Sequence, residues 1–141
     1  MPDPRPLRDG LIAVFSGTAA IDLHGDRGDL AAATAVHRQV VETVSGLWES
    51  TTFQAQIRLS ALLLGQTANE AARVGRQERA DLADRGPALV AVALAAAENG
   101  SRLGAGYLGP ESEAWIARLH AEDVRLRWTA GSDIAPDSLV D

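Results

Sequence analysis

The stretch DLHGDRGDLAAATAVH, from Asp22 to His37, contains the side chains that come closest to a chemical motif. Asp22, His24, Asp26 and Asp29 offer the carboxylate and imidazole groups that bind metal ions. However, Asp22 and His24 are two residues apart, which places them on different sides of a helix. The stretch also lacks the bidentate Glu of a calcium loop. We therefore predict that it holds no metal.

The same stretch contains Arg27-Gly28-Asp29, a tripeptide that cell-surface receptors recognise. An adhesion role needs an extracellular and usually disulfide-stabilised setting, and the chain has no Cys. A turn between two helices explains the residues better. Gly25 and Gly28 would supply left-handed backbone, and Asp29 would cap the following helix.

Residues suited to proton transfer are few and scattered. His24, His37 and His120 fall in different predicted elements, and none has a second His four residues away. We expect all three at the surface or at its boundary. Glu122 and Asp123 follow His120 on a predicted helix, where such residues usually form a solvated face. The sequence therefore predicts no catalytic, cofactor-binding or metal-binding residues, and a protein that is not an enzyme.

The composition excludes several function classes. The chain of 141 residues has 13 basic and 19 acidic residues and a net charge of −6, a poor match for a nucleic-acid backbone. All the basic residues are Arg, so Schiff-base chemistry and a P-loop lysine are excluded. The absence of Cys excludes disulfides and thiolate catalysis and fits a cytoplasmic protein.

The apolar run LIAVFSGTAAI (11–21) is the candidate for a signal peptide. Its leader is not positively charged, and small polar residues interrupt the run. No stretch is long enough to span a bilayer. We expect neither a signal peptide nor a membrane contact.

The chain is rich in Ala, Leu and Arg and has only 4% aromatic residues, which favours an all-α fold. Gly and Pro residues and apolar periodicity predict five helices, at 7–23, 30–47, 52–80, 87–102 and 110–129. The end of the third helix is open to fraying or bending, because the stretch RVGRQERADLADRG (73–86) is polar.

Three tryptophans stand out in a chain with so few aromatics. Trp48, Trp115 and Trp128 could line a ligand groove or a partner surface, but we favour the interpretation that they anchor the core. Trp128 lies nearest the end of the helical region, so we expect it to be the most exposed of the three.

Two segments resemble a known family. GPESEAWIARLHAEDVRLRWTAG (109–131) resembles a recurring helix in the C-terminal helical region of large ATP-binding LuxR-type transcriptional regulators of actinobacteria. LIAVFSGTAAIDLHGDRGDLAAATAVHRQVVETV (11–44) is similar to a tetratricopeptide-like unit of those proteins. The resemblance covers roughly residues 10–130. The chain has no P-loop, helix-turn-helix reader or basic recognition helix, so the resemblance implies a sensor or scaffold arm alone.

We therefore expect one domain over 1–141, with ordered helices from 6 to 131 and a tail or the start of a further helix at 132–141. About five helices would stack as antiparallel pairs in a short tetratricopeptide-like solenoid. An incomplete last pair would leave an apolar face uncovered and lead to self-association.

The function expected from the resemblance is a non-enzymatic module that binds a protein partner or a small effector on its concave face. Arg58, Arg73 and Arg76 are the candidate polar anchors. The alternative is a free-standing dimeric helical bundle that binds a hydrophobic small molecule through its tryptophans. Neither function requires a cofactor or direct contact with nucleic acid.

Overall fold

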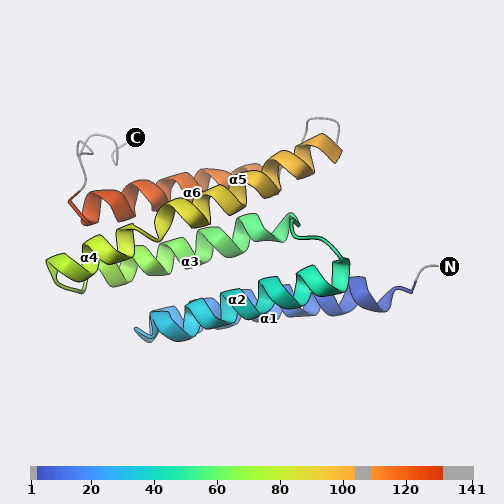
Figure 1. Cartoon of the computed structure of the whole chain (residues 1–141), viewed down its shortest axis with the longest axis horizontal. Helices are drawn as coiled ribbons and strands as arrows, with labels where there is room; N and C mark the ends of the chain where they lie inside the picture. Colours follow the sequence, from blue (N-terminus) through green and yellow to red (C-terminus); the bar gives the residue numbers. More distant parts are fainter. Residues whose placement is uncertain (1–2, 104–108, 132–141) are drawn as a thin grey trace.

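The structure, a computed structural model, describes residues 3–103 and 109–131, the last four of the first range by backbone alone. It confirms the all-α prediction: there is no strand in these two ranges. The tail predicted at 132–141 lies outside them. The helices are α1 (Arg5–Asp26), α2 (Leu30–Trp48), α3 (Ala55–Ala71), α4 (Arg76–Ala83), α5 (Gly86–Leu103) and α6 (Pro110–Thr129) (Figure 1).

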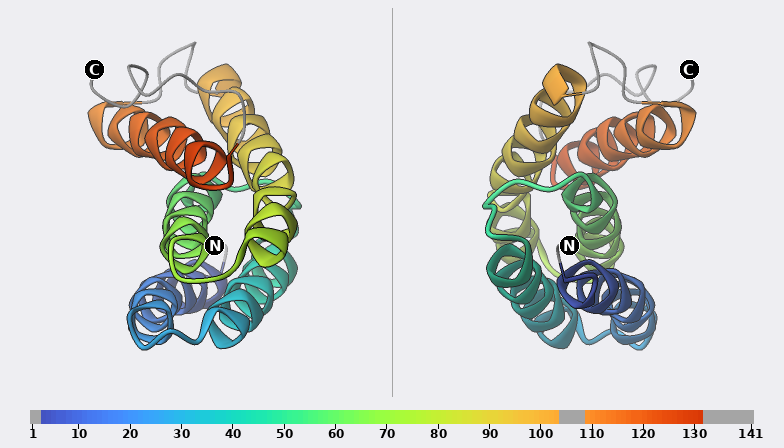
Figure 2. Two further views of the ribbon diagram at one scale, coloured as in Figure 1. Left: turned by 90° about the vertical axis from the view of Figure 1, so that its left-hand side faces the viewer. Right: turned by 90° about the vertical axis from the view of Figure 1, so that its right-hand side faces the viewer.

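The helices lie on three levels (Figures 1 and 2). Helices α1 and α2 form one outer level, α5 and α6 form the other, and α3 lies between them and leads into α4. Helix α3 packs against every other helix of the described chain. Of its 17 residues 13 are buried, so it forms the centre of the hydrophobic core.

The turn predicted at Gly28 and Asp29 is confirmed. Helix α1 ends at Asp26, Gly28 has a positive φ of 78°, and a carboxylate oxygen of Asp29 accepts a hydrogen bond from the Ala32 amide at 3.0 Å. Gly25 has a different role from the one predicted. It lies inside α1, where an added methyl group would overlap the side chain of Gln66 on α3.

The prediction of one long helix at 52–80 is wrong, because two helices occupy this segment. The break between them lies at the start of the polar stretch 73–86, where fraying or bending was expected. Helix α3 ends at Ala71, and α4 begins at Arg76 after Gly75, whose backbone is extended. Glycine is a poor helix former, so the break is cheapest there. The break redirects the chain so that Leu82 of α4 is buried in the core. The other predicted helices match the observed ones to within three residues at each end.

Glycines let α1 and α2 approach closely. A methyl group added at Gly10 would overlap the ring of Trp48, and one added at Gly17 would overlap a methyl group of Val40. Val40 is buried and branched at its Cβ, so it cannot move aside easily. The contact between these two helices therefore depends on the missing side chains of α1.

We expect Gly17→Ala to lower the free energy of unfolding by about 1–2 kcal/mol, because overpacking a tight contact outweighs the roughly 1 kcal/mol that alanine gains in a helix. Gly46→Ala is the matched control, since no atom lies within 4 Å of an added methyl group. That variant should be more stable by up to about 1 kcal/mol. Urea unfolding measures both, and equal stabilisation of the two variants would contradict the close packing.

Candidate functional site

A groove of about 690 Å³ runs between α2 and α5, with α3 as its floor. Both helices pack on α3, but they share too few contacts with each other to close over it. Apolar atoms dominate the lining, which we call the apolar groove. Its walls and floor include His37, Val41, Leu63, Leu89, Val92 and Ala95.

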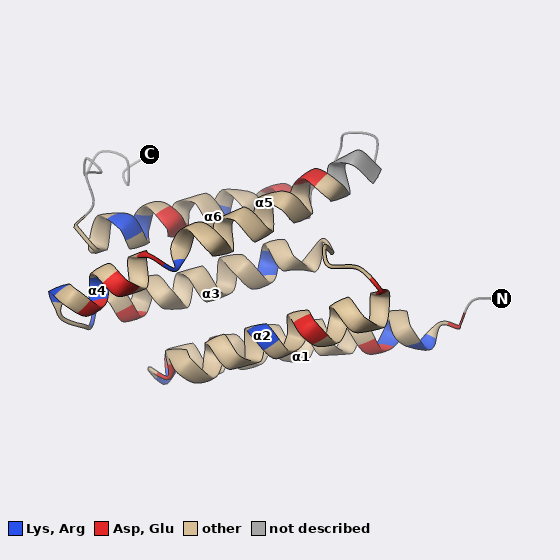
Figure 3. Ribbon diagram, viewed as in Figure 1, with Lys and Arg blue, Asp and Glu red and all other residues tan. Residues whose placement is uncertain are grey.

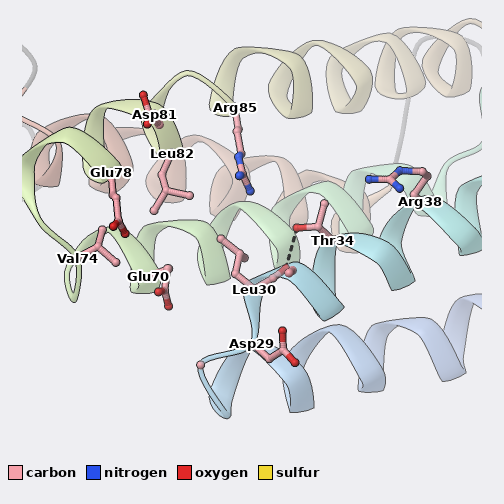
Figure 4. A pocket seen from close by; sticks show the side chains of 12 residues that line it. Asp29, Leu30, Thr34, Arg38, Glu70, Val74, Glu78, Asp81, Leu82 and Arg85 are labelled. Atoms are coloured by element: carbon pink, nitrogen blue, oxygen red, sulfur yellow. Dashed lines mark hydrogen bonds between the residues drawn. The ribbon is translucent and has the colours of Figure 1, made fainter.

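One end of the apolar groove opens into a polar hollow of about 740 Å³ (Figure 4). The two spaces share Thr34 and Arg38 of α2 and Arg85, which joins α4 to α5. Figure 3 shows how charged residues gather along α4 while most of α2 and α3 is uncharged. The carboxylates that line the hollow are Asp29, Glu70, Glu78 and Asp81.

Arg38 and Arg85 are the cations at the junction of the two spaces. Figure 4 shows Arg85 pointing from the start of α5 toward α2, with Arg38 farther along α2. Neither guanidinium forms a hydrogen bond or ion pair with any described residue. Glu70, in contrast, is already paired with Arg73 at 2.6 Å. Within the described residues, the two guanidinium groups at the junction are therefore not engaged in ion pairs.

His37 lies in the wall of the apolar groove with its Nε2 atom buried and without a hydrogen-bond partner. Burial, with a smaller contribution from the neighbouring Arg38, lowers the pKa of His37 from 6.5 to about 4. The other charged side chains on the groove are Glu42 and Arg85. The imidazole is therefore neutral at neutral pH and offers one unsatisfied polar atom beside an apolar space.

The lowered pKa makes stability depend on pH. Well above pH 6.5 the imidazole is neutral in both the folded and the unfolded chain. As the pH falls toward 4, the unfolded chain takes up the proton first, so the free energy of unfolding decreases. The full effect is on the order of 3 kcal/mol, from about 1.4 kcal/mol per pKa unit.

We expect His37→Leu to remove most of this decrease. The measurement is urea unfolding of both proteins at several pH values between 6.5 and 4. The exposed His120, replaced by Gln, is the control and should leave the wild-type slope unchanged. Parallel curves for wild type and His37→Leu would contradict the role of this imidazole.

A smaller groove of about 310 Å³ lies between α1, α3 and α6. Trp115 is on its wall, and the guanidinium carbons of Arg58 and Arg118 lie 5.4 and 5.2 Å from the centre of the Trp115 ring. Arg58 also forms an ion pair with Glu111. These contacts fix Trp115 between α3 and α6, so the ring stabilises the packing of the two helices.

The other tryptophans do not face the apolar groove. Trp48 packs on the core, where its ring lies edge-on to Phe53 at 5.5 Å and its Nε1 donates a hydrogen bond to the Pro6 carbonyl. This confirms the core interpretation for Trp48. Trp128 is 43% exposed on α6 and is the most exposed of the three, as predicted.

The three arginines chosen from the sequence do not come together. Arg58 lines the smaller groove, Arg73 forms the ion pair described above, and Arg76 lies exposed on α4. None of them lines the apolar groove. Sequence reasoning missed Arg38 and Arg85; for Arg38 the available signal was its position four residues after Thr34, on the helix face that continues to Val41.

Glu122 and Asp123 do not form the solvated face that was expected. Their side chains are only 15% and 16% exposed. Arg125 forms an ion pair with Glu122 and donates hydrogen bonds to the Gly65 carbonyl at 3.0 Å and to Asn69 at 2.8 Å. This cluster joins α6 to α3 and leaves Glu122 neutralised by an arginine, which indicates a structural role.

Within residues 3–103 and 109–131, no three His, Asp or Glu side chains form a cluster suited to a metal ion. No helix in the same ranges combines the length and the apolar character needed to cross a membrane. No protein-family model, curated protein or solved structure matches the chain. The resemblance to LuxR-type regulators therefore stays a prediction from the sequence.

Proposed function

We propose that this chain is a non-enzymatic binding module whose ligand lies in the apolar groove. The ligand class is a small, elongated and mostly apolar molecule with one acidic group. The observation that carries the proposal is an open apolar groove that ends at Arg38 and Arg85, neither of which pairs with a described residue. Arg38 and Arg85 are exposed and solvated, so they can bind an incoming acidic group without first breaking an internal ion pair.

The size and lining of the groove support a small molecule. Sites for such ligands are usually concave, mostly apolar and about 300–1,000 Å³, with a few polar groups that fix orientation. The apolar groove, at about 690 Å³, falls in this range. His37 adds a neutral polar group beside the ligand's apolar body, and a small turn of its ring would let a ligand hydroxyl satisfy Nε2.

The charges at the junction favour an acidic group on the ligand. Arg38 and Arg85 can bind a carboxylate or sulfonate through charge-assisted hydrogen bonds. The carboxylates Asp29, Glu78 and Asp81 line the hollow beyond the junction. They repel an anion that moves past the arginines, so they would hold the acidic group at the junction.

The wider setting follows from the sequence. An effector-sensing arm similar to the helical region of a LuxR-type regulator would use such a groove, with its helices stacked as a short solenoid and located in the cytoplasm. The layered helices of Figure 2 are compatible with this arrangement. A helix of a protein partner is the second candidate occupant, because the groove runs beside residues 34–42 of α2 and 88–95 of α5. Self-association is a separate part of the proposal, favoured by apolar side chains exposed on α1.

The first test uses 1-anilinonaphthalene-8-sulfonate, a fluorescent probe with an apolar body and one acidic group. We expect saturable binding that Val92→Glu weakens at least ~10-fold, because the change places a charge inside an apolar site. Leu94→Glu is the matched control: Leu94 lies on the same helix and is equally exposed at 40%, but it does not line the groove. Equal loss in both variants would contradict binding in the groove.

The second test concerns the acidic group. We expect Arg38→Gln and Arg85→Gln each to weaken binding of the sulfonate probe about fivefold, the effect of roughly 1 kcal/mol. Nile red, which is apolar and uncharged, should bind these arginine variants as tightly as it binds the wild-type protein. Arg76→Gln is the control, since Arg76 lies outside the groove. If the arginine variants bind both probes like wild type, the ligand is not recognised by its charge.

A further inference from the structure

Helix α1 exposes an apolar face that nothing in the described structure covers. Most of the large apolar side chains exposed in the described parts of the chain belong to this one helix. They are Leu7 (60% exposed), Leu11 (41%), Ile12 (56%), Phe15 (59%) and Leu23 (49%). Single exposed apolar residues are ordinary, but Leu7, Leu11 and Phe15 follow one another at four-residue spacing on one side of α1, which is the pattern of an interface. Ile12 lies beside them, and Leu23 lies eight residues beyond Phe15.

The charges on α1 are arranged around Phe15. Arg8 lies seven residues before Phe15 and Asp22 lies seven residues after it, which places all three on one stripe of the helix. No charged residue occurs from Gly10 to Ile21. The stripe therefore has a positive end, an apolar middle and a negative end.

We propose that this face binds the α1 helix of a second copy of the chain, antiparallel, with Phe15 at the two-fold axis. Reversal about Phe15 brings Arg8 of each copy level with Asp22 of the other, so that two opposite-charge pairs flank one apolar centre. A parallel arrangement would instead set like charges opposite each other. This inference rests on the self-association proposed above and does not depend on the ligand groove.

A second copy fits this face better than an unrelated partner for a simple reason. A stripe whose two ends have opposite charge is complementary to its own reversed copy. Arg8 already contacts Asp9 at 3.3 Å, but both side chains are at least half exposed, so that pair adds little and can be exchanged. Asp22 forms no hydrogen bond or ion pair with a described residue.

The test measures molecular mass by sedimentation equilibrium over a range of protein concentrations. We expect a dimer whose Kd rises at least ~30-fold in Phe15→Ser, as for a residue at the centre of an interface. Arg8→Asp and Asp22→Arg should each raise Kd about 10-fold, and the double variant should return to within about threefold of wild type. Trp128→Ser, which removes an apolar side chain that is 43% exposed on α6, should leave Kd unchanged.

The outcomes separate the inference from the proposals above. A wild-type protein that is monomeric at every concentration overturns both the self-association and this surface. A dimer that Phe15→Ser and the charge reversals leave intact overturns this surface alone. Circular dichroism shows whether each variant keeps its helical content, and restoration in the double variant cannot arise from unfolding. Binding of the sulfonate probe is measured on the same samples and decides the groove separately.

Discussion

The burial of α3 on nearly all sides is the constraint on which the rest of the structure depends. A helix in this position needs neighbours above and below, and the α1–α2 and α5–α6 levels supply them. Three of its four buried polar side chains find partners inside the core, whereas the Ser60 Oγ has none among the described residues. Gln56 accepts a hydrogen bond from the Phe53 amide, Gln66 donates to Asp26, and Thr67 donates to the Leu63 carbonyl. These bonds avoid most of the cost of burying polar groups.

One helix between two pairs cannot fill the full width of the molecule, and the grooves follow from this geometry. The apolar groove lies on the side of α3 where α2 and α5 face each other, and the smaller groove lies on the side of α1 and α6. The second side is tied together by Trp115 and by the Arg125–Glu122 cluster. Among the residues that the structure describes, the first side has no comparable cluster, and its arginines form no ion pair. This difference is the physical reason for assigning ligand binding to the larger groove.

The groove and the exposed face of α1 are separate properties of the fold. The groove is formed by α2, α3 and α5, and the exposed apolar residues of α1 lie outside its lining. Leu11 and Phe15 instead border the smaller groove beside α3 and α6. A dimer through α1 would therefore leave the groove open in both copies.

The groove has an energetic cost at His37. Its Nε2 is buried without a partner among the described residues, which in general costs about 1–3 kcal/mol. A fully closed core would avoid that cost.

The sequence by itself determined the helical class, the bounds of most helices and the turn at Gly28 and Asp29, because propensity, capping and glycine geometry act over a few residues. It also identified Trp128 as exposed. Only the tertiary structure decided that α3 is buried on nearly all sides, since periodicity shows an apolar face but not how many neighbours will cover the other sides. It likewise decided that Arg38 and Arg85 line the same groove. Residues so far apart in the chain come together only through the packing of α2 and α5 on α3.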